Sequence, residues 1–322
     1  MATWFNDSSS EIAFSRFDKL MMPTYRFTYL IIRITLGTIL GKEKRNGSLF
    51  FQKLHKGNYV NPTFLAKIYL NRFLSIFKLN KSTAEIYIPK YDHKILCPLN
   101  EVDYISLVSR EEDILQKFNP QEGDVVVDIG AHLGRYSIIG SKKVKFKGKV
   151  ISIEANPNVF DLLSKNIKLN ELKNVILLNC AAYSKKKKIN FYLHKNANLV
   201  NNHYGTVMDG IDEFSNKGFN KVIEVEANTL DEILFENNIE KNTVRWLKID
   251  VEGAEFEVLK GAKNLLSEST KLSILIEIHN LSKGNNYFKE INKYLKSHGF
   301  EMTFEERHDT GEAHVIFSKI QL

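Results

Sequence analysis

Hydrophobic and polar positions alternate regularly from about residue 119 to the end of the chain. Short runs rich in β-branched residues are separated by segments with helical apolar spacing, which is typical of parallel strands joined by crossover helices. The strands expected for the parallel part are 125–130, 149–154, 175–180, 245–250 and 272–279. The helices expected between and after them are 134–142, 157–170, 229–238, 254–266 and 286–298.

The last strands indicate which kind of α/β fold this is. A pair at 301–306 and 313–319 closes the chain, and further strand pieces are expected at 188–193 and 221–227, with Lys185–Lys188 as a charged hairpin turn. A closing antiparallel hairpin is unusual for a dinucleotide-binding dehydrogenase and typical of S-adenosylmethionine methyltransferases. We therefore predict an α/β, Rossmann-like methyltransferase fold with a mostly parallel seven-stranded sheet and a C-terminal antiparallel hairpin.

Residues 1–95 lack this alternation and carry the excess of positive charge. Between residues 19 and 81 there are twelve Lys and Arg residues and one acidic residue, Glu43, in a chain of net charge +7. We predict a mainly helical, basic accessory region at 1–95 and the methyltransferase domain at 96–322. An apolar helical face within 27–40 is expected to pack on that domain, with a membrane surface as the alternative. The basic charge of 19–81 indicates an anionic partner, for which an anionic membrane, a phosphorylated substrate and nucleic acid all qualify.

The expected compartment is the cytoplasm. The longest apolar stretch, 27–40, is interrupted by Arg33 and is shorter than the roughly 20 residues of a spanning helix. The first residues lack the charged-then-apolar layout of a secretory signal. Two cysteines, Cys97 and Cys180, are too few for a disulfide framework and show no metal-ligand spacing. These features predict a reducing, cytoplasmic setting, with peripheral membrane contact as an addition that the basic region allows.

A glycine-containing loop follows the first parallel strand and reads Asp128-Ile129-Gly130-Ala131-His132-Leu133-Gly134. Its glycines let backbone N–H groups at a helix start approach a polar ligand without a Cβ in the way. The spacing differs from the Gly-x-Gly-x-x-Gly of pyrophosphate-binding domains, because His132 stands where the middle glycine would be. We expect a cofactor without a pyrophosphate, bound by Asp128, Gly130, Ala131, His132 and Gly134.

The ends of the next two strands complete the expected cofactor site. Glu154, followed by Ala155, can accept hydrogen bonds from both hydroxyls of an unphosphorylated ribose. Cys180 and Ala181 supply small side chains where an adenine ring would lie against the sheet. Each has an ordinary alternative, since an acid is common at a helix start and small residues pack well at a strand end. Together with the glycine loop, they predict S-adenosyl-L-methionine as the cofactor.

Acidic residues and a histidine follow the fourth and fifth strands. Asp250 ends one strand, Glu252 and Glu255 lie at the next helix start, and Glu277 and His279 share one face of the other strand. We expect Asp250, Glu252 and His279 to be catalytic, with a neutral His279 accepting a proton, one of the two acids orienting it, and Asp250 also bordering the cofactor. Helix-start chemistry, a purely structural His279 and a divalent cation in this cluster are the alternatives. No spacing is diagnostic of a metal site, so no metal is expected.

The stretch from Gly123 to about Phe317 resembles the FkbM-type methyltransferases in the segments DIGAHLG, LKIDVEGAEFEVLKGA and ILIEIH. The resemblance covers about 60% of the chain. It implies O-methylation of a hydroxyl, typically on a sugar or natural product. Asp128, Gly130 and Glu154 match the family's cofactor positions, and Asp250 matches the acid that borders the transfer site. The implied acceptor is a small molecule, a sugar or a glycolipid.

Two other functions remain as alternatives. RNA methylation would use the basic region as an electrostatic platform. Against it, the fourth strand is followed by Asp250–Gly253 and not by the Asn/Asp-Pro-Pro-aromatic motif of amino-group methyltransferases, so nucleic acid is not the expected partner. A non-catalytic scaffold with the same fold is the other alternative, and the intact Asp128, Gly130 and Gly134 argue against it.

Overall fold

The computed structural model describes residues 83–98, 111–194, 205–207, 219–279, 285–308 and 312–319. The predicted basic stretch 19–81 and its apolar part 27–40 lie outside these residues. The described end of region 1–95 contains strands rather than a helix: β1 (Thr83–Ile88), the 3-10 helix η1 (Pro89–Tyr91) and the first part of β2 (His93–Pro98).

The described elements belong to two units. The first contains β1 and η1, and the second contains most of β2 and everything described from residue 111 onwards. The domain boundary expected between residues 95 and 96 stays a prediction.

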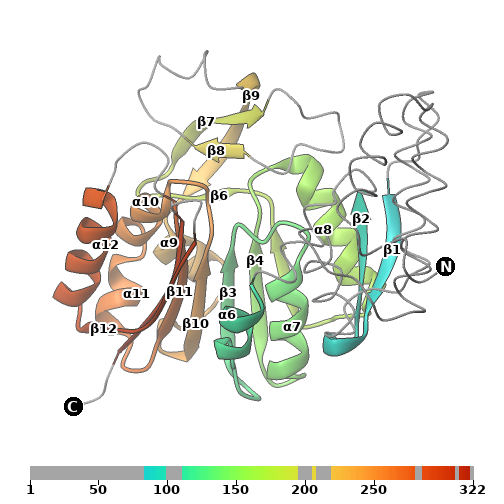
Figure 1. Cartoon of the computed structure of the whole chain (residues 1–322), viewed down its shortest axis with the longest axis horizontal. Coiled ribbons are helices and arrows are strands. Elements are labelled where there is room, and N and C mark those ends of the chain that lie inside the picture. The colour runs from blue at the N-terminus through green and yellow to red at the C-terminus, as the bar shows by residue number, and fades with distance from the viewer. Residues whose placement is uncertain are drawn as a thin grey trace, which may run out of the picture. The chain divides into compact units, whose positions relative to one another are not determined.

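A seven-stranded sheet forms the centre of the second unit (Figure 1). Its order is β12-β13-β11-β10-β3-β4-β5, with neighbours from β11 to β5 parallel and β13 antiparallel to both of its neighbours. The strands are β3 (Val125–Ile129), β4 (Lys149–Ile153), β5 (Val175–Leu178), β10 (Val244–Ile249), β11 (Ser273–Ile278), β12 (Phe300–Arg307) and β13 (Ala313–Lys319). All of β3 is buried, Asp128 included, as expected for a strand of a parallel sheet that is covered on both faces. The predicted seven-stranded sheet with a C-terminal antiparallel hairpin is confirmed.

Helices cover both faces of this sheet. On one face the strands share a single apolar core with α9 (Leu230–Glu236), α10 (Glu255–Lys260), α11 (Lys263–Glu268) and α12 (Asn285–Ser297). On the other face lie α6 (Glu112–Lys117) and α7 (Arg135–Val144). There Phe118, directly after α6, packs edge-to-face on Tyr136 of α7 and Trp246 of β10. The helix α8 (Pro157–Leu169) follows β4, with Asn156 as its N-cap.

The single helix predicted at 254–266 is wrong, because α10 and α11 occupy this range as two short helices. A Cβ on Gly261, between them, would lie 2.0 Å from the carbonyl oxygen of Tyr183, so the backbone packs directly against a distant segment. The carboxylate of Asp231 accepts hydrogen bonds from two N–H groups in the first turn of α11. These tertiary contacts break the helix and cap its second half.

A separate four-stranded sheet is inserted between β5 and α9 (Figure 1). It consists of β6 (Ala181–Ala182), β7 (Lys187–His194), β8 (Gly205–Val207) and β9 (Phe219–Asn228), in the order β6-β9-β7-β8. The predicted pieces at 188–193 and 221–227 are parts of β7 and β9. The hairpin turn predicted at Lys185–Lys188 is wrong, because this tract joins β6 to β7, which pair with opposite edges of β9.

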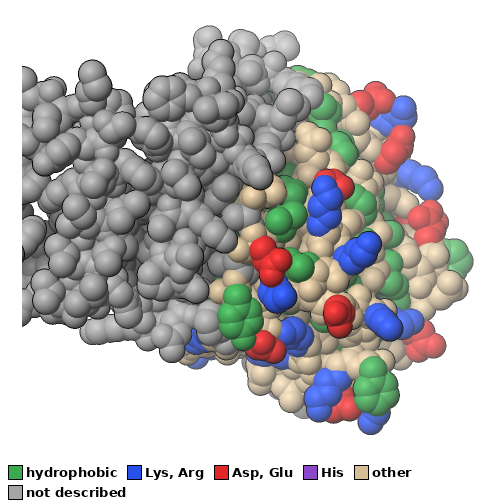
Figure 2. All heavy atoms as spheres, turned by 90° about the vertical axis from the view of Figure 1, so that its right-hand side faces the viewer, with side chains coloured by type: hydrophobic (Ala, Val, Ile, Leu, Met, Phe, Trp, Pro, Cys, Tyr) green, Lys and Arg blue, Asp and Glu red, His purple; other side chains and the backbone are tan. Residues whose placement is uncertain are grey.

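The described surface carries charges of both signs. Figure 2 shows Lys and Arg side chains interspersed with Asp and Glu over the described part of one face. Exposed ion pairs such as Lys145–Glu122, at 2.7 Å, and Lys165–Asp161, at 2.6 Å, belong to this pattern. Within the described ranges, no helix is both long enough and apolar enough to cross a bilayer.

Candidate functional site

The loop after β3 is shaped by contacts that require glycine. Gly130 has φ +71°, and a Cβ there would lie only 1.7 Å from the carbonyl oxygen of Asp250. Gly134 has φ +92° at the start of α7, and its Cβ would meet Leu163 of α8 at 2.7 Å. Asp128 is fully buried, and its Oδ2 accepts a hydrogen bond from Ser137 Oγ at 2.5 Å. The loop is therefore a tight backbone cradle, as its sequence predicted.

Glu154 clamps this loop from the end of β4. Its two carboxylate oxygens accept hydrogen bonds from the backbone N–H groups of His132 and Asn156, both at 2.9 Å. Burial raises the pKa of Glu154 to about 7, although the Asn156 and His132 N–H groups act to lower it. Burial also lowers the pKa of His132 to about 4, so its ring is neutral at pH 7. A half-ionised, buried carboxylate suits hydrogen-bond donors such as the two hydroxyls of a ribose.

The small residues expected near an adenine ring lie at the junction of the two sheets. Ala155 packs against the core of the small sheet, in which Ala181 is itself buried, and Cys180 packs partly against the main core. Burial raises the pKa of Cys180 to about 11, so it is a thiol at pH 7. Asn179 was not singled out from the sequence, yet its Nδ2 donates to the Glu154 carbonyl at 2.8 Å and the Ala155 carbonyl at 3.2 Å. Its amide therefore holds the segment that carries Glu154.

A buried lysine that the sequence analysis missed joins the cofactor loop to Asp250. Lys248 Nζ donates to the carbonyl of Gly130 at 2.8 Å and lies 3.2 Å from Asp250 Oδ2 and 3.5 Å from Asp128 Oδ1. Burial acts to lower the pKa of Lys248, but the charges of Asp250 and Asp128 outweigh it and raise the pKa. The signal available in the sequence was a lysine between Leu247 and Ile249, in the part of β10 that is buried.

His279 is held by a residue other than the two acids expected. Its Nδ1 lies 2.7 Å from Oε1 of Glu255, which also accepts from the N–H of Gly253 at 2.8 Å. The other carboxylate oxygen of Glu255 accepts from the Tyr287 hydroxyl at 2.9 Å. The expectation that Asp250 or Glu252 orients this ring is therefore wrong, because the fully buried Glu255 does so from the first turn of α10.

The opposite nitrogen of His279 faces the remaining carboxylates. Nε2 lies 3.5 Å from Glu252 Oε2, 3.7 Å from Glu277 Oε1 and 3.9 Å from Asp250 Oδ1. The sequence predicted that Glu277 and His279 share a face, and this is confirmed.

The charge states in this cluster differ from those expected. Burial acts to lower the pKa of His279, but the hydrogen bond to Glu255 and the charges of Glu252, Glu255 and Asp250 outweigh it, and the pKa is raised well above 6.5. Burial raises the pKa of Glu252 to about 7 and also raises that of Glu277. With the pKa raised in this way, His279 favours the cationic form at pH 7, and Glu252 is a group able to accept a proton near neutral pH, while burial favours the protonated form of Glu277 in the same direction.

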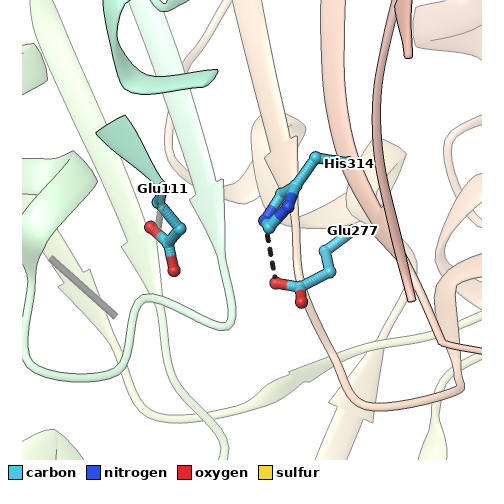
Figure 3. Close-up of side chains that lie close together, drawn as sticks. All are labelled: Glu111, Glu277 and His314. Atoms are coloured by element: carbon cyan, nitrogen blue, oxygen red, sulfur yellow. Dashed lines mark ion pairs between the residues drawn. The ribbon is translucent and has the colours of Figure 1, made fainter. Parts of the chain in front are cut away.

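A second group of ionisable residues adjoins the first (Figure 3). His314 Nε2 lies 3.2 Å from Glu277 Oε2, because His314 and Glu277 are direct neighbours across β13 and β11. Figure 3 shows Glu111 facing this pair from before α6, and its carboxylate binds Arg135 Nη1 at 2.8 Å. The sequence analysis did not single out Glu111 or His314. Only the antiparallel register of β13 against β11 brings His314 to Glu277.

Comparison with known proteins identifies the family to which this chain is related. The profile of the Methyltransferase FkbM domain matches residues 128–302, and that of the protein-L-isoaspartate(D-aspartate) O-methyltransferases matches residues 53–183. Hexuronic acid methyltransferase AglP of Haloferax volcanii is 29% identical over 171 residues, which are 52% of this chain and 62% of that protein's length. Methyltransferase sdnD of Sordaria araneosa is 27% identical over 198 residues, which are 55% of this chain and 74% of that protein.

A solved structure described as a SAM-dependent methyltransferase from Aquifex aeolicus aligns with a TM-score of 0.39 and 17% identity, and covers 65% of this chain and 89% of that chain. The FkbM match spans more than half of this chain. It confirms the predicted methyltransferase class, with S-adenosylmethionine as the cofactor. The chain belongs to the FkbM methyltransferase family.

Proposed function

We propose that this protein transfers the methyl group of S-adenosylmethionine to a hydroxyl oxygen of a sugar, a glycolipid or a related small molecule. The observation that carries the proposal is the direct link between the two halves of the site. Lys248 Nζ contacts both the Gly130 carbonyl of the cofactor loop, at 2.8 Å, and the carboxylate of Asp250, at 3.2 Å. The residues expected to hold the cofactor and those expected to meet the acceptor are therefore one continuous group.

The cofactor half has the features that an adenosine requires. The loop has left-handed backbone at Gly130 and Gly134, where a Cβ would collide with the Asp250 carbonyl or with Leu163, so the two glycines let the loop pack tightly against these residues. We assign the ribose hydroxyls to Glu154, whose oxygens already fix the backbone of His132 and Asn156. S-adenosylmethionine supplies an already activated methyl group, so the protein's tasks are to align the acceptor oxygen and to remove its proton.

The acceptor half suits a hydroxyl group. Carboxylates accept hydrogen bonds from O–H donors, and Asp250, Glu252 and Glu277 all converge on His279. We assign the proton-accepting step to Glu252 or Glu277, because His279 is already protonated when the site is free of ligand. As the acceptor oxygen bonds to the methyl carbon and the carbon–sulfur bond breaks, the hydroxyl proton passes to one of these carboxylates.

One relative is a hexuronic acid methyltransferase, which supports a sugar as the first class of acceptor to try. The test is transfer of labelled methyl from S-adenosylmethionine to neutral hexoses, hexuronic acids and glycolipids. The Glu252→Gln/Glu277→Gln double variant should turn over ~10²–10⁴ times more slowly at saturating cofactor, the usual effect of losing a general base. Glu224→Gln, an exposed change in β9, is the matched control and should keep the wild-type rate. Cofactor binding with transfer to RNA, and to none of these hydroxyl compounds, would refute the proposal.

We also infer that 96–322 is the catalytic domain and that region 1–95 is an accessory part that meets an anionic surface. The charge asymmetry supports this, with twelve basic residues and one acidic residue in 19–81.

A further inference from the structure

Three side chains beside the cofactor loop have the arrangement of ligands around one missing cation. One donor atom each from Asp250, Glu252 and His279 lies within 4.8 Å of the other two. From His279 Nε2, the carboxylate oxygens are 3.5 Å (Glu252) and 3.9 Å (Asp250) away. Two ligands about 2.1 Å from a shared ion are about 3.0–3.4 Å apart at octahedral or tetrahedral angles, so small side-chain rotations would complete the site.

The histidine is presented as a metal ligand would be. Glu255 binds Nδ1 at 2.7 Å and is itself fixed by the Gly253 N–H and the Tyr287 hydroxyl. This fixes the ring so that Nε2 faces the two other ligands. A carboxylate behind one imidazole nitrogen is the usual support for a metal on the other nitrogen, because it sets the tautomer and makes the ligand more basic.

A second buried polar group interacts electrostatically with part of this cluster. Tyr136, at the start of α7, is 94% buried, and its hydroxyl has no hydrogen-bond partner among the described residues. Burial raises the pKa of Tyr136 well above its usual value, and the charges of Glu111, Asp250 and Glu277 also act to raise it. Buried hydroxyls normally have a hydrogen-bond partner, so this side chain has capacity for one further polar ligand.

We propose that Asp250, Glu252 and His279 bind one divalent first-row transition-metal cation. Two carboxylates and an imidazole suit Mn²⁺, Fe²⁺ or Zn²⁺ better than the all-oxygen preference of Mg²⁺ or Ca²⁺. The cation takes the place of the proton on His279 Nε2. It offsets the charge of the surrounding carboxylates and leaves Glu277, paired with His314, to accept a proton. This extends the sequence-based expectation, in which no metal was assigned and a cation in this cluster was the alternative.

The cation gives the pocket a way to accept a negatively charged sugar. Without it, the carboxylates of Asp250, Glu252 and Glu277 would repel an acceptor that carries its own carboxylate. With it, an acceptor oxygen can coordinate the ion and lose its proton more readily. This role in turnover rests on the proposed O-methyl transfer, whereas metal binding itself does not.

The test measures metal binding without cofactor or acceptor. Full-length protein is treated with a chelator, dialysed and titrated with Mn²⁺ while free Mn²⁺ is followed by electron paramagnetic resonance. We expect one saturable Mn²⁺ per chain, bound at least about tenfold more weakly by Glu252→Gln and by His279→Gln. The bound ion should show nitrogen coupling in pulsed spectra of the wild type. Glu277→Gln, in the same pocket, is the matched control and should keep the affinity for Mn²⁺ while losing methyl transfer.

Several outcomes would overturn the site. They are an absence of saturable Mn²⁺ binding by the wild type, unchanged binding in His279→Gln, and loss of binding in Glu277→Gln. Thermal unfolding with and without Mn²⁺ separates loss of the metal site from poor folding of a variant. Of the four proteins, only the wild type and Glu277→Gln should be stabilised by the ion. A protein that binds Mn²⁺ but methylates no hydroxyl compound refutes the proposed function and leaves the metal site standing. Methyl transfer that is undiminished after chelation refutes the metal's role in turnover.

Discussion

Cofactor affinity should depend on pH through Glu154. This buried carboxylate has a pKa of about 7, raised chiefly by burial, and we assign it to the ribose hydroxyls. Those hydroxyls donate hydrogen bonds, so they bind the ionised form best. The affinity for the cofactor should therefore fall as the pH is lowered through 7. The folding stability of the protein without cofactor changes with pH in the opposite direction. Because the pKa is raised above 4.5, ionising Glu154 costs folding stability as the pH rises from 4.5 to about 7.

The magnitude follows from the ionised fraction. With a pKa of about 7, the carboxylate of the free protein is about nine-tenths ionised at pH 8 and about one-tenth ionised at pH 6. The dissociation constant should accordingly rise about tenfold between pH 8 and pH 6, and about half a proton should be released per ligand bound at pH 7. In Glu154→Gln the dependence should vanish, and affinity should drop about 5- to 150-fold at pH 8, the equivalent of about 1–3 kcal/mol for lost partners.

The other charged groups that face Glu154 do not titrate in this range. Lys248, with a raised pKa, and Asp250, with a lowered pKa, keep their charges between pH 6 and pH 8. The ring of His132, with a pKa of about 4, stays neutral. Glu252 has a pKa of about 7 at the acceptor end, where it could act on the charge of a sulfonium. S-adenosylhomocysteine, which lacks that charge, is therefore the better ligand for the measurement.

The assay is isothermal titration of S-adenosylhomocysteine at pH 6, 7 and 8, in buffers of different ionisation enthalpy, so that proton release is counted directly. Glu252→Gln serves as the control and should keep the full pH dependence. A flat affinity in the wild type, or the same slope in Glu154→Gln, would show that Glu154 does not bind the ribose.

Three further predictions concern the links within the site and the basic region. Gly130→Ala should lower the free energy of unfolding in urea by about 2–4 kcal/mol and abolish cofactor binding, because the new Cβ would collide with the Asp250 carbonyl. The control is Gly123→Ala, at φ +90° with no atom within 4 Å of the new Cβ, which should lower it by only about 1 kcal/mol. Lys248→Met should lower the free energy of unfolding by about 3–5 kcal/mol in the same assay, because it leaves the carboxylates of Asp128 and Asp250 without their cationic partner. A loss under 1 kcal/mol would contradict this. Full-length protein should bind anionic vesicles in a strongly salt-dependent way and a version without 19–81 should not; equal binding to neutral vesicles would contradict an electrostatic contact.

Local patterns predicted the parts of this protein that local chemistry determines. The parallel strands of the main sheet follow from short runs rich in β-branched and other apolar residues, such as Val125–Val127, and the β3 loop follows from the spacing of Gly130 and Gly134. The helix break at Gly261 could not be predicted in this way, because it depends on the carbonyl of Tyr183, directly after β6 of the small sheet. The small sheet was only partly anticipated, since β6 has two residues and β8 three, too few to show a period.

The same limit applies to the acceptor end of the site. Alternation along β11 is enough to put Glu277 and His279 on one face. It cannot tell which of three nearby acids binds Nδ1 of that ring, because this depends on how α10 packs against the sheet. Glu255 resembled an ordinary helix-start acid in the sequence. The contact with Tyr287 of α12 that fixes it appears only when the helices are assembled.

The chain enters and leaves the small sheet at neighbouring positions, because the first and last residues of this segment pair with each other. Ala181 and Ala182 pair with Ala227 and Asn228, and the N–H of Tyr183 donates to the Asn228 carbonyl at 2.8 Å. Everything between this start and this end is one contiguous insert, whereas Glu154 and the β3 loop precede it and Asp250 follows it. Evolution or a protein engineer can therefore exchange this insert as a cassette between relatives, provided that the pairing at its base is kept. New acceptor preferences could then arise while Glu154 and the β3 loop stay unchanged.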